Sequence, residues 1–323
     1  MLPVHRRLLE RVRQSGPVRG VILDTPAAFQ SNVHELSTQA EDFFSTSLRV
    51  EVTTLAWDDY RLPAARPEYL ARLKSANFIF CGPGSPSYAL REWSGTDVPE
   101  ILRGLLWTGA CIAFSSAAAL TLGAATVPVY EIYKAGDDPY WLEGMDLLSA
   151  LGLTVAVVPH FNNRSGQGFD TRFCFLGERR FHRLLELMPG DASVLGIDEH
   201  TACLLDGQSR SLSAMGRGKV TFLTGDRTIE LARGQLIGLD EVAGGEPPRP
   251  PAPTPEPASE ARAGGQPIDA GRLKPLIEAL VAMRAEARAA SQWELADRIR
   301  DTLAAAGVEV RDENGGTGWS MRD

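Results

Sequence analysis

One strand-to-helix corner in the sequence carries residues suited to acyl-transfer chemistry. A strand expected over 110–115 runs directly into a helix, and only small residues, Ser115 to Ala119, occupy the corner. A sharp corner of this kind lifts a serine side chain above the sheet, as in a nucleophile elbow. The N–H of Ala117, at the start of the helix, would face a developing oxyanion. The pattern therefore predicts Ser116 as a nucleophile and Ala117 as an oxyanion donor.

Two other expected strands end in residues that complement this corner. The loop Gly82-Pro83-Gly84-Ser85 follows a strand expected over 77–81, and the Gly84 N–H would supply a second oxyanion donor. His160 follows a strand expected over 154–158 and is suited to act as a general base. Catalytic groups of α/β sheets collect beyond the carboxyl ends of the strands, where all three segments would lie.

Each of these residues also has a structural interpretation. Ser116 suits an N-cap of the following helix, and His160 suits a hydrogen-bond donor at a strand end. Cys111 is an alternative nucleophile, but its place inside the expected strand predicts a buried, inert thiol. A domain that binds a ligand without hydrolysing it therefore remains the competing hypothesis.

The first 240 or so residues alternate short apolar runs with helical patterns, which predicts right-handed βαβ units. The expected fold class is α/β, with a mostly parallel, doubly wound sheet. The segments that carry this prediction are strands over 18–23, 49–57, 77–81, 110–115, 154–158 and 193–197, and helices over 33–48, 67–76 and 88–107. From 202 to 230 the pattern is richer in strands, with a hairpin expected around 224–226.

The order of these motifs resembles the peptidase E and cyanophycinase family, which has a class I glutamine amidotransferase-like fold. The motifs are G-P-G-S, S-S-A-A-A, P-H-F and G-I-D-E-H-T-A, and they span roughly residues 77 to 206. The resemblance implies a serine hydrolase that works through an acyl-enzyme, with Ser116 as nucleophile and His160 as base. It also implies Glu131, 15 residues after Ser116, as the triad acid. Asp198 and Glu199 would support the site from behind.

This family's known members act on aspartyl dipeptides or cyanophycin, so the resemblance implies a small amide or an acidic peptide as substrate. The sequence departs from the family pattern at three positions. Phe114 and Ala118 replace glycines of the elbow, and Pro83 lacks the N–H that a glycine would offer.

Seven prolines among residues 246–257 separate this domain from a short helical tail. Such a stretch predicts an extended, semi-rigid spacer of roughly 35 Å. The expected organisation is thus an α/β domain over 1–242, a linker over 243–267 and a helical module over 268–323, with two helices broken near 291–292 and the second ended by Gly307.

The tail resembles the C-terminal end of cysteinyl-tRNA synthetase. It carries R-x-x-A-R, then A-D-x-I-R-D-x-L, then G-V-x-V-x-D and G-T-x-W, over about 276–319. The resemblance implies tRNA as a partner of residues 268–323. The sequence contains neither the H-I-G-H nor the K-M-S-K-S signature, so it does not predict a functional synthetase. Because residues 269–323 hold eight basic and ten acidic side chains, a net charge of 8 − 10 = −2, a protein partner is an equal alternative.

Composition bounds the remaining possibilities. The chain of 323 residues has a formal net charge of −8, which gives no general attraction to nucleic acid or anionic membranes. Neither a signal peptide nor an apolar run of spanning length is recognisable. The four scattered cysteines form no C-x-x-C pair, so we expect neither a zinc site nor a disulfide framework, and a reducing cytoplasm fits best. We expect no metal or other cofactor.

Overall fold

A computed structural model describes residues 2–225 and 227–242 and, in the tail, residues 277–278, 280–285, 288, 296, 299–300, 303, 308–313 and 316–321. The chain divides into two compact units, residues 1–250 and 251–323. The predicted linker over 243–267, the helix break at 291–292 and the helix end at Gly307 lie outside the described residues.

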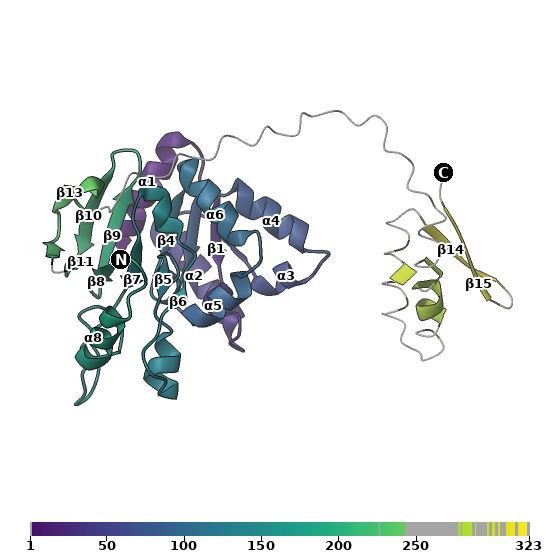
Figure 1. The fold of residues 1–323 in the computed structure, drawn as a ribbon. Coiled ribbons are helices and arrows are strands. Elements are labelled where there is room, and N and C mark those ends of the chain that lie inside the picture. The colour runs from purple at the N-terminus through teal and green to yellow at the C-terminus, as the bar shows by residue number, and fades with distance from the viewer. Residues whose placement is uncertain are drawn as a thin grey trace. The chain divides into compact units, whose positions relative to one another are not determined.

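The N-terminal unit is built on two main sheets with helices packed against them (Figure 1). The first sheet is parallel, in the order β2-β1-β3-β4, and consists of Gly20–Leu23 (β1), Val52–Leu55 (β2), Phe78–Cys81 (β3) and Cys111–Phe114 (β4). The second is mixed, in the order β12-β11-β8-β7-β5-β6, and consists of Ala125–Thr126 (β5), Leu142–Glu143 (β6), Val155–Val158 (β7), Ser193–Ile197 (β8), Val220–Thr224 (β11) and Arg227–Leu231 (β12).

In the second sheet β5, β7 and β8 are parallel, whereas β6, β11 and β12 pair antiparallel with their neighbours. A small antiparallel sheet, β13-β10-β9, is formed by Thr201–Asp206 (β9), Ser211–Gly216 (β10) and Leu236–Gly238 (β13). The α/β class and the mostly parallel arrangement predicted from sequence are confirmed. The predicted hairpin around 224–226 is the β11–β12 pair.

The α-helices of this unit are Leu2–Ser15 (α1), Val33–Leu48 (α2), Trp57–Arg61 (α3), Arg66–Ser75 (α4), Pro86–Trp93 (α5), Val98–Trp107 (α6), Ala117–Leu120 (α7) and Glu178–Glu186 (α8). Short 3₁₀ turns cover Thr25–Ala27 (η1), Leu147–Leu151 (η3) and Leu239–Glu241 (η4), and a π-helical turn covers Glu131–Ala135 (η2). The helix predicted over 88–107 is two helices, because Gly95 takes the left-handed φ of 70° between them.

Alternating side chains of the first sheet enter different cores. Val21 and Leu23 pack on the side of α4, α5 and α6, whereas Ile22 packs with α1 and α2. Apolar side chains therefore occupy both faces of the sheet, and polar groups can gather only beyond the carboxyl ends of its strands. The short helix α7 joins the cores, because Ala118, Ala119 and Leu120 belong to three different apolar clusters.

His5 on α1 gives a stability test of the packing between α1 and α2. Its ring contacts those of Phe43, Phe44 and Phe80, and its Nδ1 is buried without a partner within the described residues. Burial lowers the pKa of His5 to about 4. The unfolded chain therefore takes up a proton below the ordinary pKa of 6.5 that the folded chain refuses until about pH 4, and stability is lost as pH falls through this window.

We expect His5→Leu to remove about 2 kcal/mol of the stability loss between pH 7 and pH 5. Urea unfolding followed by tryptophan fluorescence at the two pH values measures this difference. His182→Gln, at an exposed position on α8, is the matched control and should change this pH dependence much less than His5→Leu. An unchanged pH dependence in His5→Leu would contradict the burial argument.

The tail unit combines helix with an unpredicted hairpin. The described residues between 277 and 303 are helical, as expected. Val308–Glu313 (β14) and Gly316–Met321 (β15) pair antiparallel. Ile277, Val281, Leu303 and Val308 form an apolar cluster that joins the helical part to β14.

Candidate active site

Ser116 occupies a strained corner between β4 and α7. Its backbone has φ 55° and ψ −121°, a conformation that a side-chain-bearing residue adopts only when its surroundings enforce it. Two backbone hydrogen bonds hold the corner: Ser115 N–H donates to Cys81 O at 3.0 Å, and Ala118 N–H donates to Gly82 O at 3.3 Å. The buried alanines of α7 let the chain turn directly under the serine.

His160 lies opposite Ser116 at the end of β7. The distance from Ser116 Oγ to His160 Nε2 is 3.0 Å, a hydrogen-bonding contact. The histidine has a positive φ of 52°, and its carbonyl accepts the N–H groups of Asn163 and Cys174. The ring of Phe175 lies 5.5 Å from the imidazole, centroid to centroid. The backbone of His160 is thus held by two hydrogen bonds, and one face of its imidazole packs against Phe175.

The carboxylate beside His160 is that of Glu199. Its Oε1 lies 3.2 Å from His160 Nδ1 and also accepts a hydrogen bond from Asn163 Nδ2 at 2.5 Å. Asn162 Oδ1 accepts the Glu199 N–H at 2.9 Å, which fixes the backbone of this residue. Partial burial acts to raise the pKa of Glu199, but the hydrogen bonds from Asn163 and His160 outweigh it and lower the pKa.

Glu131, expected beside His160, lies elsewhere. It is on η2 rather than on a strand, and its Oε2 accepts a hydrogen bond from Ser87 Oγ at 2.9 Å. After α7 the chain passes through β5 into η2, which brings Glu131 to the start of α5. Glu199 reaches His160 because β7 and β8 are parallel neighbours, with Val158 opposite Gly196. Their ends therefore carry His160 and Glu199 to the same place.

Asp198, the other residue expected to support the site, faces away from the histidine. It is 7% exposed, and its Oδ2 accepts the N–H of Lys219 at 2.9 Å. This bond ties the end of β8 to the start of β11.

The two expected oxyanion donors lie on segments tied to the elbow. Gly84 has φ 150°, and a Cβ at this position would lie 2.0 Å from Pro26 O, so only glycine fits. Ala117 is the first residue of α7. Neither N–H has an acceptor among the residues that the structure describes, which leaves both available to a substrate oxygen. Pro83, which precedes Gly84 in the loop after β3, offers no N–H of its own.

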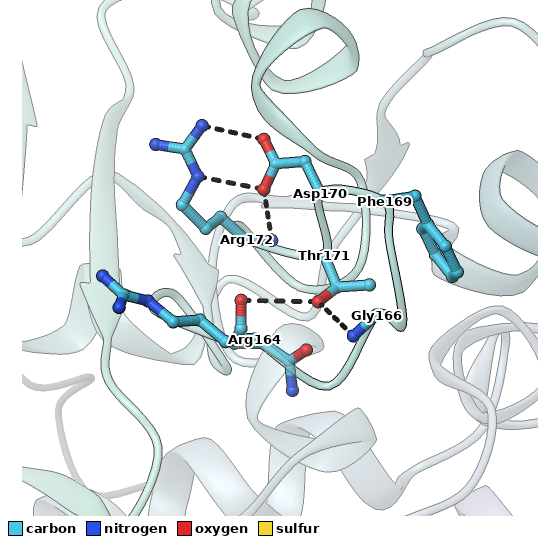
Figure 2. Close-up of a pocket in the computed structure, with 7 residues that line it drawn as sticks. Arg164, Gly166, Phe169, Asp170, Thr171 and Arg172 are labelled. Carbon is cyan, nitrogen blue, oxygen red and sulfur yellow. Dashed lines mark hydrogen bonds and ion pairs between the residues drawn. The ribbon is translucent and has the colours of Figure 1, made fainter.

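A cavity of about 340 Å³ adjoins the histidine loop. Figure 2 shows Arg164, Phe169, Thr171 and Arg172 among its lining residues. Asn163 also lines the cavity. Arg172 is paired with Asp170 and Glu178 at 2.8 Å each. Arg164 has no hydrogen-bond or ion-pair partner in the described parts of the chain. Asn163 borders the cavity and also donates to Glu199, so this one residue links the cavity to the cluster of Ser116, His160 and Glu199.

The alternative nucleophile, Cys111, is unsuited to this role. It lies within β4, and its Sγ contacts the carbonyl oxygen of Leu8 at 3.8 Å. Burial raises the pKa of its thiol, which disfavours the reactive thiolate. Among the described residues, no group of His, Cys, Asp and Glu side chains is arranged to hold a metal ion. Within the same residues, no helix has the length and apolar character needed to cross a membrane.

The fold of the N-terminal unit is similar to that of a solved protein described as a peptidase. The chain is similar to the crystal structure of a peptidase from an acI-B1 Actinobacterium, with a TM-score of 0.59 and 21% identity over 73% of this chain and 90% of that one. At this identity the likeness defines the fold alone. A putative peptidase E protein from Listeria monocytogenes EGD-e is more distant, with 14% identity and a TM-score of 0.43.

The tail has a separate likeness. Residues 270–319 match the family model of the cysteinyl-tRNA ligase anticodon binding domain. The chain is 46% identical over 69 residues to the cysteine–tRNA ligase of Pseudomonas paraeruginosa, and 45% identical over 88 residues to that of Micrococcus luteus. These matches cover 21% and 27% of this chain but only 14% and 15% of the ligases. The resemblance suggested by the tail motifs is thereby confirmed, and the resemblance of the N-terminal unit to a peptidase is confirmed for its fold.

Proposed function

We propose that residues 1–242 form a serine hydrolase that cleaves a small amide or peptide. The observation that carries this proposal is the line of contacts from Ser116 Oγ through His160 to Glu199, at 3.0 and 3.2 Å, with the serine held in a strained elbow. A serine that only capped a helix would need neither the strain nor the histidine, and α7 shows no side-chain cap from Ser116.

The reaction would proceed through an acyl-enzyme. Ser116 Oγ attacks the substrate carbonyl carbon while its proton passes to His160 Nε2, and the N–H groups of Gly84 and Ala117 stabilise the oxyanion. Glu199 accepts the Nδ1–H of the imidazolium and holds the ring in place. The imidazolium then gives its proton to the leaving amine as the C–N bond breaks. Water, activated by the neutral His160, hydrolyses the Ser116 ester.

The cavity beside the histidine loop supports a substrate with an anionic group. Arg164 lines the cavity and has no partner among the residues that the structure describes, whereas Arg172 is already neutralised by Asp170 and Glu178. Arg164 would recognise a substrate carboxylate by its charge, and Asn163 and Glu199 connect this cavity to His160. Acidic dipeptides therefore form the first substrate panel, with the corresponding amidated peptides as controls.

Labelling with a fluorophosphonate tests the proposal without knowledge of the substrate. The purified chain should gain the mass of one phosphonyl group, and peptide mapping should place it on Ser116. Retention of the unmodified mass, together with stable binding of an acidic peptide that is not cleaved, would favour the alternative of a ligand-binding domain. The cytoplasmic location is part of this proposal and is tested by fractionation of cells.

For the tail, we propose a tRNA partner bound by residues 268–323. The match of residues 270–319 to an anticodon binding domain supports it. We expect the full chain to retard tRNA in a gel at moderate salt and to lose this binding as salt rises, because phosphate contacts depend on counterion release. A chain of residues 1–242 is the control and should not shift tRNA. Equal shifts by both chains, or none by either at tens of micromolar, would favour a protein partner.

A further inference from the structure

The oxyanion loop, residues 82–85, is attached on both sides by backbone hydrogen bonds. On one side Gly82 O accepts the N–H of Ala118 in the elbow, at 3.3 Å. On the other side Ser85 N–H donates to Pro26 O of η1, at 2.7 Å. Three segments that follow β1, β3 and β4 are therefore linked in series along the carboxyl edge of the first sheet. A displacement of η1 would therefore displace the loop through these hydrogen bonds.

Gly84 makes the contact between η1 and the loop close. The position of a Cβ on Gly84 would lie 2.0 Å from Pro26 O and 2.7 Å from Ala27 N, so the two backbones pack directly against each other. A shift of η1 cannot be absorbed by a flexible side chain at this contact. The direction of the Gly84 N–H therefore depends on where η1 lies.

Two buried polar side chains hold η1 in place. Asp24 Oδ1 accepts the N–H of Trp57 at 2.8 Å, and Trp93 Nε1–H donates to Thr25 Oγ1 at 3.2 Å. Asp24 is 8% exposed and Thr25 is fully buried. The indole of Trp57 is held in turn, since its Nε1–H donates to Glu92 on α5. η1 is thus fixed to α3 and α5 by specific hydrogen bonds rather than by apolar packing alone.

The buried carboxyl of Asp24 lowers the stability of the folded domain when it is ionised. Burial raises the pKa of this carboxyl to about 6, and the charge of Asp58 acts in the same direction. No ion pair with a cation balances it within the described residues. A group whose charged form is disfavoured by its own surroundings, next to a reaction site, is expected to have a role beyond packing.

We propose that Asp24 and Thr25 are positioning residues, which set the oxyanion loop by anchoring η1 through Trp57 and Trp93. They touch no substrate and act through Pro26 and Gly84. The inference rests on the proposed hydrolase function for its catalytic consequence, but the anchoring itself is independent of it.

Hydrogen exchange of the full chain, followed by mass spectrometry, tests the anchoring. Asp24→Ala and Thr25→Val remove the two anchors and should speed exchange in residues 82–88. Asp24→Asn and Thr25→Ser keep an acceptor in place and should retain the wild-type protection. Unchanged exchange of residues 82–88 in both Asp24→Ala and Thr25→Val would overturn the inference, whatever the enzyme does.

The rate of phosphonylation of Ser116 tests the consequence. We expect Asp24→Ala and Thr25→Val to lower it about 10- to 100-fold, as for a displaced oxyanion donor, with recovery in Asp24→Asn and Thr25→Ser. Leu9→Ala, in the core between α1, α2 and the first sheet, is the control for general destabilisation, because that cluster contains no residue of α7. An equal loss of rate in this control, at an equal loss of thermal stability, would contradict a positioning role. An unlabelled wild-type chain with altered exchange in Asp24→Ala would refute the hydrolase and leave the anchoring supported.

Discussion

Ser116→Ala is expected to abolish phosphonylation and to lower amide hydrolysis by at least about 10³-fold, because the acyl-enzyme has no other attacking group in the site. His160 Nε2, the proposed proton acceptor, lies 3.0 Å from Ser116 Oγ, and within the described parts of the chain it contacts no other serine. The matched control is Ser115→Ala. Ser115 is exposed, and its backbone N–H, which holds the elbow to Cys81 O, is unaffected by the substitution.

Ser116→Gly separates chemistry from folding at the same position. The positive φ of Ser116 is unfavourable for a residue with a Cβ and natural for glycine. We therefore expect Ser116→Gly to raise the melting temperature while phosphonylation is lost. Labelling that persists in Ser116→Ala, at wild-type stability, would require a different nucleophile.

Glu199→Gln is expected to lower the rate of phosphonylation about 10²- to 10⁴-fold, since a neutral amide neither stabilises the imidazolium nor fixes the required tautomer. Glu199 Oε1 contacts both His160 and Asn163, so glutamine would place an amide N–H against a donor in one of its two orientations. Thermal unfolding of the variant measures whether the fold is retained.

Glu131→Gln is the matched control for this substitution. Glu131 bonds Ser87, and a glutamine oxygen accepts that hydrogen bond equally well. We expect a rate within a few-fold of wild type. A loss in Glu131→Gln as large as that in Glu199→Gln would show that the carboxylate 15 residues after Ser116 acts on the histidine during turnover.

Local patterns were sufficient to predict much of the fold. The helix expected over 33–48 is α2 with the same bounds, since its apolar spacing is continuous and Arg49 ends it in a left-handed conformation. The corner at Ser116 was predictable because small residues between a strand and a helix leave few other geometries. The tail hairpin was missed, since Val308–Glu313 and Gly316–Met321 are stabilised by pairing with each other, which their own periodicity does not express.

The partner of His160 depends on strand order, which sequence spacing does not give. Counting along the chain from Ser116 points to Glu131, but the two residues end up on segments that diverge after α7. The useful signal was the pair of strands over 155–158 and 193–197, each followed at once by polar residues. If these two strands are taken as parallel neighbours, Glu199 falls beside His160 without any reference to a family.

Ser116, the proposed nucleophile, lies just before α7, where the first and second sheets of the domain meet. Ser116 follows the last strand of the first sheet, whereas His160 and Glu199 follow strands of the second, and the three residues after Ala117 each enter a different core. Each of these side chains packs in its own core, while the backbone that carries it is held by the packing of the other two. We therefore expect a substitution that changes the volume of any of these three cores to shift α7. Such a shift would lengthen the distance between Ser116 Oγ and His160 Nε2 before the domain unfolds.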